Sequence, residues 1–150
     1  TLVLSVLLYN SETWWLKEST KKKLRVFEMS CLRKIKGVTR RNRVRNTEIR
    51  RELKVETDVV QIIQRRRLRY FGHITRMSGE RLPAIAFSGN VHGSRKRGRP
   101  KKRWEDNLKA DLDEMGHTMV EAIRLASSDR DVWRKSVLGL SERGSPSPRH

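Results

Sequence analysis

A run of eleven residues, Gly93–Arg103, most constrains how this chain can fold. Seven of the eleven are Lys or Arg, and none is acidic. The two glycines and Pro100 exclude a continuous helix through the run. Seven like charges cannot be buried together without losing their hydration, so we predict an exposed segment that contacts an anionic partner. The phosphate backbone of a nucleic acid fits that requirement best.

The charge of the whole chain points to the same partner. Its 150 residues contain 35 Lys and Arg against 17 Asp and Glu, a formal net charge of +18 with a pI near 11.2. RNA or DNA is therefore the expected partner, ahead of an anionic membrane surface. Apolar residues make up only 35% of the chain, which predicts a thin hydrophobic core.

Catalytic and metal-binding patterns are missing from the sequence. Cys31 is the only cysteine, so an internal disulfide and a multi-cysteine zinc site are excluded. Asp111 and Asp113, like Asp129 and Asp131, are two residues apart, and on a helix this spacing points the carboxylates in different directions. We therefore expect no catalytic residue, no metal, no cofactor and no small-molecule substrate. The oligomeric state stays open.

Apolar spacings of three and four residues predict an all-α fold of short amphipathic helices. On the first long helix, Leu24, Phe27, Cys31 and Ile35 form the expected buried stripe, and Gly37 is the expected stop. Asp58, Thr118 and Asp129 are expected to cap later helices, and Gly116 to end one. The expected helices cover residues 17–36, 47–53, 58–77, 104–115 and 118–126, with a last one from 129.

The apolar opening, Leu2–Tyr9, is too short to span a membrane. We expect a buried strand or the end of a helix there, and no signal peptide, because no basic region precedes it. The predicted organisation is a basic helical region over 1–87, a basic Gly/Arg/Pro linker over 88–103, a small acidic helical unit over 104–140 and a disordered tail over 141–150.

Two groups of residues are the candidate nucleic-acid contacts. On the 58–77 helix, four arginines cover most of the circumference, so at least two should face outward toward phosphates. The alternatives are a solvated face or ion pairs with acids elsewhere. Tyr70 beside them is the candidate for stacking on a base. The first group is Arg65, Arg66, Arg67, Arg69 and Tyr70, and the second is Arg95, Lys96, Arg97, Arg99, Lys101, Lys102 and Arg103.

Within the second group, Arg97-Gly98-Arg99-Pro100 matches the core of an AT-hook peptide. Glycine would let the backbone approach the floor of a narrow A·T minor groove, with an arginine extending along it on each side. Sequence-tolerant phosphate binding and a plain linker are the alternatives. Trp104 and Trp133 lie on apolar stripes, so we expect them in the core rather than stacked on bases.

The order of these motifs resembles the region that follows the polymerase core in non-LTR (LINE-type) retrotransposon reverse transcriptases. The resemblance runs over residues 5–135. The motifs that carry it are Leu7-Leu-Tyr-Asn-Ser-Glu-Thr-Trp14, Phe27-Glu-Met-Ser-Cys-Leu-Arg33, Arg65-Arg-Arg-Leu-Arg-Tyr-Phe-Gly-His73, Arg97-Gly-Arg-Pro100, Arg103-Trp104 and Asp129-Arg-Asp-Val-Trp-Arg134.

This resemblance implies a chain that corresponds to the thumb-proximal helices and C-terminal segment of an endonuclease/reverse transcriptase. It implies a grip on template RNA or target DNA, and a nuclear location with transit through the cytoplasm. The Tyr/Phe-x-Asp-Asp turn of the polymerase has no counterpart, since Tyr9 precedes Asn10-Ser11 and Tyr70 precedes Phe71-Gly72. The RNA-directed DNA polymerase and endonuclease activities of the family are therefore not expected of this chain alone.

Overall fold

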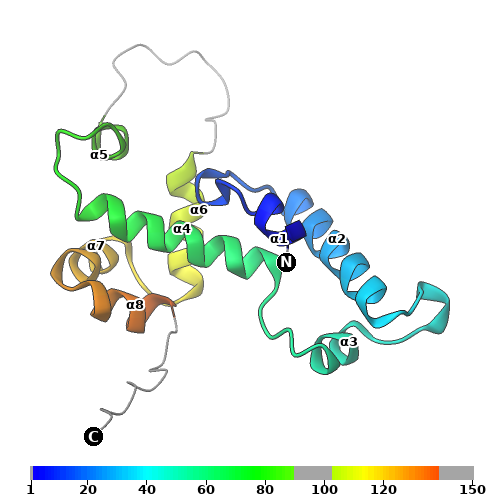
Figure 1. Cartoon of the computed structure of the whole chain (residues 1–150). Coiled ribbons are helices and arrows are strands. Elements are labelled where there is room, and N and C mark those ends of the chain that lie inside the picture. The colour runs from blue at the N-terminus through cyan, green and yellow to red at the C-terminus, as the bar shows by residue number, and fades with distance from the viewer. Residues whose placement is uncertain (1, 90–102, 139–150) are drawn as a thin grey trace, which may run out of the picture. The chain divides into compact units, whose positions relative to one another are not determined.

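The computed structural model describes residues 2–89 and 103–138, and there the chain is helical with no strand (Figure 1). The all-α prediction is confirmed. The predicted basic linker lies almost entirely, and the predicted tail wholly, outside the described residues, and both stay predictions. The helices are α1 (Leu2–Leu7), α2 (Glu18–Lys36), α3 (Asn46–Glu52), α4 (Val59–Thr75), α5 (Leu82–Ser88), α6 (Trp104–Glu114), α7 (Met119–Ser128) and α8 (Arg130–Leu138), with 3₁₀ turns η1 (Ser11–Thr13) and η2 (Arg40–Asn42).

The internal contacts divide the chain into two compact units, and the division falls inside α4. The first unit ends at Arg65 and the second begins at Arg66. The domain boundaries predicted at residues 87 and 103 stay predictions. The contacts divide after Arg65 because Leu68 and Phe71, on the second half of α4, pack into one core with Leu108 of α6. The start of α4 instead packs within the first unit.

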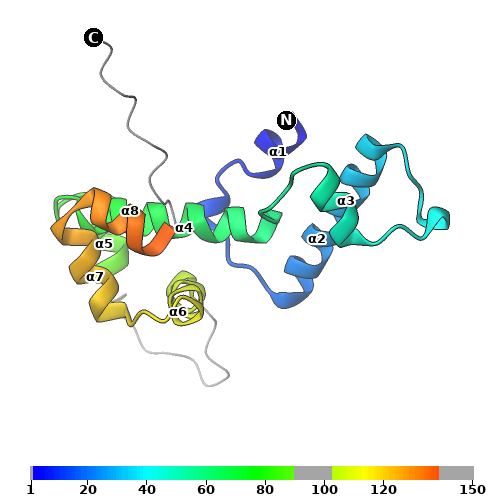
Figure 2. The same ribbon diagram turned by 90° about the horizontal axis from the view of Figure 1, so that it is seen from below.

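The first unit has two small hydrophobic clusters. In one, Leu8 and Leu16 pack with the first turns of α4, through Val59, Val60 and Ile63. In the other, α2 and α3 lie side by side, and Met29, Leu32 and Ile49 form the buried centre (Figure 2). Because each cluster is small, the first unit depends on polar contacts between its helices as well as on apolar burial.

The buried face of α2 differs from the predicted stripe. Phe27 is 45% exposed and Ile35 is 71% exposed, so their predicted burial is wrong. The face toward α3 carries Glu28, Met29 and Leu32 instead. The buried carboxylate of Glu28 accepts a hydrogen bond from the Arg50 guanidinium on α3, which explains how an acidic residue occupies this face.

The opening segment forms helix α1 rather than a strand. Its apolar side chains are largely exposed, with Leu2 at 82% and Val6 at 77%, whereas Leu8 beyond its end is buried at 4%. The predicted burial therefore holds for the end of the segment. For its beginning we expect packing partners outside this chain, so burial there stays a prediction. None of the described helices combines the length and the apolar content that crossing a membrane requires.

The predicted helix ends are largely confirmed. Asp58 Oδ1 accepts the backbone N–H of Gln61 at 2.8 Å at the start of α4, and Thr118 with Glu121 forms the capping box of α7. Gly37 (φ 72°) and Gly116 (φ 77°) follow α2 and α6 in the left-handed conformation, which glycine adopts without steric cost. Helix α3 begins one residue before the predicted cap, Thr47.

The second unit is built around Trp133 of α8. Its side chain is 1% exposed and packs against Phe71 with ring centroids 5.6 Å apart. Phe87 of α5 and Trp104 of α6 complete the aromatic cluster, where their ring centroids are 6.1 Å apart. The prediction that Trp104 and Trp133 belong to the core is confirmed.

Candidate nucleic-acid interface

The predicted contacts on α4 differ in exposure. Arg65 and Arg69 are exposed, Arg66 is half-buried and Arg67 is only 1% exposed. Arg65 also donates a hydrogen bond from Nη1 to Thr57 Oγ1 at 3.4 Å. The expectation that at least two of the four arginines face outward is met by Arg65 and Arg69.

Arg67 has a structural role in this fold. Its Nη1 donates to Oδ2 of Asp111, and that carboxylate is 3% exposed. Two buried opposite charges that pair with each other are costly to separate, because either one alone would remain desolvated. The alternative of an ion pair with an acid elsewhere therefore holds for Arg67, and we exclude it from the candidate interface.

The remaining predicted contacts lie at the second unit or outside the described residues. Tyr70 is half-buried, and its ring meets Trp104 edge-on, with centroids 6.1 Å apart and planes at 83°. Arg103 is exposed, and its backbone N–H donates to Asp106 Oδ2 at 2.6 Å, so its main chain begins α6. The contacts that lie outside the described residues are Arg95, Lys96, Arg97, Arg99, Lys101 and Lys102.

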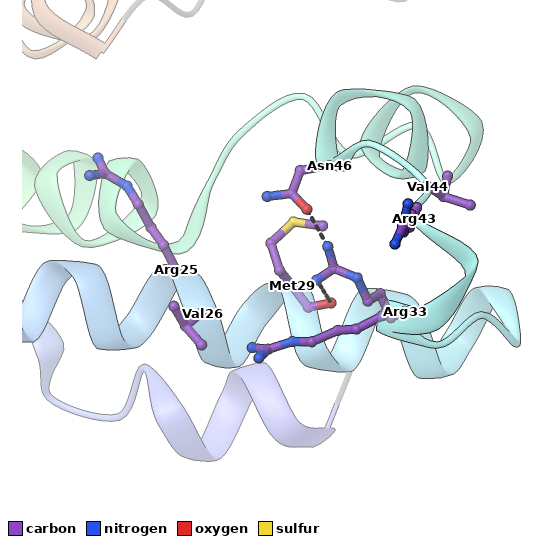
Figure 3. Close-up of a pocket in the computed structure, with 8 residues that line it drawn as sticks. Arg25, Val26, Met29, Arg33, Arg43, Val44 and Asn46 are labelled. Atoms are coloured by element: carbon purple, nitrogen blue, oxygen red, sulfur yellow. Dashed lines mark hydrogen bonds between the residues drawn. The ribbon is translucent and has the colours of Figure 1, made fainter.

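A basic site lies in the first unit, within the residues that the structure describes. A pocket of about 420 Å³ opens between α2 and the segment that joins it to α3 (Figure 3). We call it the arginine pocket. Four arginines, three apolar side chains and one amide line it: Arg25, Arg33, Arg40, Arg43, Val26, Met29, Val44 and Asn46.

Two of the four arginines are held by neighbouring groups. Figure 3 shows Arg33 of α2 reaching toward Asn46, where Nη2 donates to the amide Oδ1. Its Nη1 donates to the Met29 carbonyl at 3.4 Å. Arg25 Nε donates to Oδ2 of Asp58 at 2.9 Å, so the acid that caps the start of α4 partly neutralises Arg25. These contacts orient two guanidinium groups along the pocket.

The other two have exposed side chains: Arg40 begins the short turn η2, and Arg43 directly follows it. Within the part of the chain that the structure describes, no carboxylate lies within 4 Å of either guanidinium. Thr39 and Asn42 hold this turn, since the Thr39 backbone N–H donates to Asn42 Oδ1 at 2.8 Å. Their charges are thus available to an external anion.

Arg43 also has an unusual backbone conformation. Its φ of 53° and ψ of 23° place it in the left-handed region, which a side chain with a Cβ adopts at a cost of about 1–2 kcal/mol. Strained residues of this kind concentrate at functional sites when the surrounding structure holds them in place. Arg43 combines this backbone conformation with a place in the lining of the pocket.

The chemistry of the arginine pocket suits a nucleotide unit. Guanidinium groups donate planar, bidentate hydrogen bonds to phosphate oxygens. Met29 is buried, while Val26 and Val44 keep part of their apolar surface open at the pocket wall. An apolar wall beside cationic donors can accept a sugar or base while the arginines hold its phosphate.

The sequence reasoning missed Arg40 and Arg43 as site residues. The segment from Val38 to Asn46 is a visibly basic connector, with four arginines in nine residues. What singles out two of the four is the turn geometry, which points Arg40 and Arg43 into the pocket while Arg41 and Arg45 do not line it.

The described residues contain no group of three or more His, Cys, Asp or Glu side chains placed to hold a metal ion. Cys31 is a free, half-buried thiol. Trp14 packs against the first cluster of the first unit, and Trp15 is partly exposed with Lys17 Nζ 5.3 Å from its ring centroid.

Comparisons with known proteins give one informative match. The chain is 26% identical over 140 residues to an uncharacterized transposon-derived protein of Caenorhabditis elegans, a match that covers 89% of this chain and 50% of that protein. No family model and no solved structure matches. The chain therefore spans about half the length of this relative, and the similarity supports an origin in a transposable element.

Proposed function

We propose that this chain is a nucleic-acid-binding segment of a transposable-element protein that grips RNA or DNA through backbone phosphates. The observation that carries the proposal is the arginine pocket, where Arg40 and Arg43 have no carboxylate within reach among the described residues. The net charge of +18 supplies the long-range attraction for a polyanion.

The motif order supports a more specific version of this function, and the transposon-derived relative supports only its transposable-element part. On that version, the segment belongs to a non-LTR retrotransposon reverse transcriptase and holds template RNA or target DNA beside the polymerase. The proposed location is the nucleus. Catalysis is not proposed for this chain alone, because the polymerase and endonuclease motifs have no counterpart in its sequence.

The test is nucleic-acid binding across a salt series, with a variant pair matched in charge. Arg40→Gln/Arg43→Gln removes two charges from the pocket, and Arg41→Gln/Arg45→Gln removes two charges from the same connector outside it. Each phosphate contact contributes about 0.7–0.9 to the slope of log affinity against log salt. We expect Arg40→Gln/Arg43→Gln to reduce the magnitude of that slope by about 1.4–1.8. The control, Arg41→Gln/Arg45→Gln, should reduce it much less.

Two outcomes would contradict the proposal. If the wild-type chain binds neither RNA nor duplex DNA at low salt, the function is wrong. If both pairs of substitutions have the same effect, diffuse charge rather than the arginine pocket is responsible. A·T-rich and G·C-rich duplexes belong in the same series, with Arg97→Ala/Arg99→Ala, because an A·T preference lost in that variant would favour the AT-hook alternative.

A further inference from the structure

A second cluster of arginines lies in the second unit, where α8 packs against α4. The side chains of Arg69, Arg76, Arg130 and Arg134 surround a depression of about 160 Å³, and Trp133 forms part of its lining. We call it the α4–α8 depression. Arg69 lies on α4 and Arg76 directly follows the end of that helix, while Arg130 and Arg134 lie four residues apart on one side of α8.

The position of the two helices is fixed by Trp133. Its indole Nε1 donates to the Leu68 carbonyl at 3.2 Å, and its ring packs directly over Gly72. Arg134 follows this anchor directly, and Arg130 precedes it by three residues. The burial of Trp133 therefore fixes the backbone positions from which both arginines extend.

Arg76, just beyond the end of α4, is also oriented. Arg76 Nη1 donates at 2.6 Å to the carbonyl of Ala126, in the last turn of α7. A guanidinium at a helix C-terminus interacts favourably with the carbonyl dipoles there. This hydrogen bond uses one of the five N–H donors of Arg76, which leaves the others for a ligand.

The charges of the depression are poorly balanced. Among the described residues, the nearest carboxylate is that of Asp131, 3.9 Å from Arg134 Nη1 and 77% exposed. An ion pair of this length at the surface contributes little. No described carboxylate lies within 4 Å of Arg69, Arg76 or Arg130. Four cations with one weak counter-charge repel one another, and a bound anion relieves that repulsion.

We propose that the α4–α8 depression binds a single phosphate group of a nucleic-acid backbone. Its volume of about 160 Å³ is less than half that of the arginine pocket, and the four arginines that line it carry the guanidinium donors that phosphate oxygens accept. The identity of the phosphate as part of a nucleic acid rests on the proposed function. The anion site itself depends only on the four arginines.

The first experiment uses inorganic phosphate, with sodium chloride at matched ionic strength as the control. Nitrogen–proton NMR spectra report the Trp133 indole and the arginine Nε groups. We expect a saturable shift of the Trp133 indole with phosphate that Arg130→Gln/Arg134→Gln abolishes. Lys109→Gln/Arg124→Gln, which removes two exposed charges elsewhere in the second unit, should leave the shift intact. No shift in the wild-type chain overturns the site, whether or not nucleic acid binds.

The second experiment asks whether nucleic acid uses the site. In the salt series, Arg130→Gln/Arg134→Gln should lower the slope by about 0.7–0.9, as the loss of one phosphate contact predicts. An unchanged slope, with the phosphate shift still present in the wild-type chain, overturns the assignment to a nucleic acid. If the wild-type chain binds no nucleic acid, the proposed function fails instead, and the NMR result still decides the anion site. Arg69→Gln provides a second variant if the α8 pair unfolds.

Discussion

The indole ring of Trp133 packs against the backbone of Gly72 so closely that a Cβ atom at residue 72 would lie 2.5 Å from the indole Nε1. The same nitrogen donates its hydrogen bond to the Leu68 carbonyl, one turn earlier on α4. Because Trp133 is 1% exposed and held on all sides by the core, it cannot move aside cheaply. Glycine at this position is a packing requirement between α4 and α8.

Gly72→Ala should therefore destabilise the second unit although alanine favours helix. The helix propensity gained is about 1 kcal/mol, whereas overpacking a core typically costs about 1–3 kcal/mol. We expect these opposing terms to leave a net loss of stability of up to about 2 kcal/mol, measured by urea denaturation followed by Trp fluorescence. Gly79→Ala is the matched control, because nothing lies within 4 Å of a Cβ at that position. Equal stability of the two variants would contradict this account.

The Arg67–Asp111 pair should behave as structure and not as part of the interface. Asp111→Ala leaves the Arg67 charge buried without its carboxylate, a change that typically costs about 3–5 kcal/mol. Replacing both residues, as Arg67→Met/Asp111→Leu, removes both buried charges together and should cost much less than Asp111→Ala. Urea denaturation of the two variants measures the difference.

The double variant also tests the exclusion of Arg67 from nucleic-acid contact. Once folded, it should bind RNA and DNA with the wild-type salt slope, because the buried guanidinium contributes no phosphate contact. If the salt slope of this variant falls in magnitude by about 0.7–0.9, the value for one phosphate contact, Arg67 belongs to the interface.

The strain at Arg43 allows stability to be separated from binding. Arg43→Gly relieves the left-handed conformation at φ 53° and removes one cation from the arginine pocket. We expect stability equal to or slightly above that of the wild type, because the relief is offset by the larger entropy of glycine in the unfolded chain. Nucleic-acid affinity should fall, with a slope lower by about 0.7–0.9.

Lys54→Gly is the control for Arg43→Gly. Lys54 also has a φ of 53° and is exposed, and its replacement by glycine removes one positive charge. Unlike Arg43, however, it does not line the arginine pocket. Its stability should change in the same direction, while its binding stays near that of the wild type. If both variants lose the same affinity, the binding depends on net charge alone.

Local features of the chain could be predicted from the sequence, and partners distant in the sequence could not. The caps at Asp58 and Thr118 were predicted correctly because a capping residue and its target are three positions apart. The buried face of α2 was not predicted correctly, because Met29 and Glu28 face inward only through the packing of α3. Arg67 has its partner 44 residues along the chain, a separation that no periodicity encodes.

The candidate site follows the same division. The sequence identifies the basic segments, and Arg69 was predicted as a contact from the charge pattern of α4. Its companions Arg76, Arg130 and Arg134 were missed, because they join Arg69 only when Trp133 packs on α4. Arg40 and Arg43 were missed because the turn that selects them depends on the Thr39–Asn42 hydrogen bonds. To find these five arginines, their spacing along the sequence has to be combined with the way neighbouring helices pack.

The capping box of α7 should make the second unit sensitive to acid. The Thr118 backbone N–H donates to Glu121 Oε2 at 2.9 Å and, with the Thr118 side chain, lowers the pKa of Glu121 below its ordinary value of 4.5. A carboxyl whose pKa is lower in the folded state contributes stability above the unfolded pKa. That contribution is lost as the pH falls through the folded value, so the affected window lies below about pH 4.5.

Glu121→Gln keeps an acceptor for the Thr118 N–H but does not titrate. The stability of the wild type should therefore fall relative to this variant as the pH drops from 5 to about 3, measured by thermal unfolding. Parallel curves for the two proteins would show that the capping box does not contribute to the pH dependence.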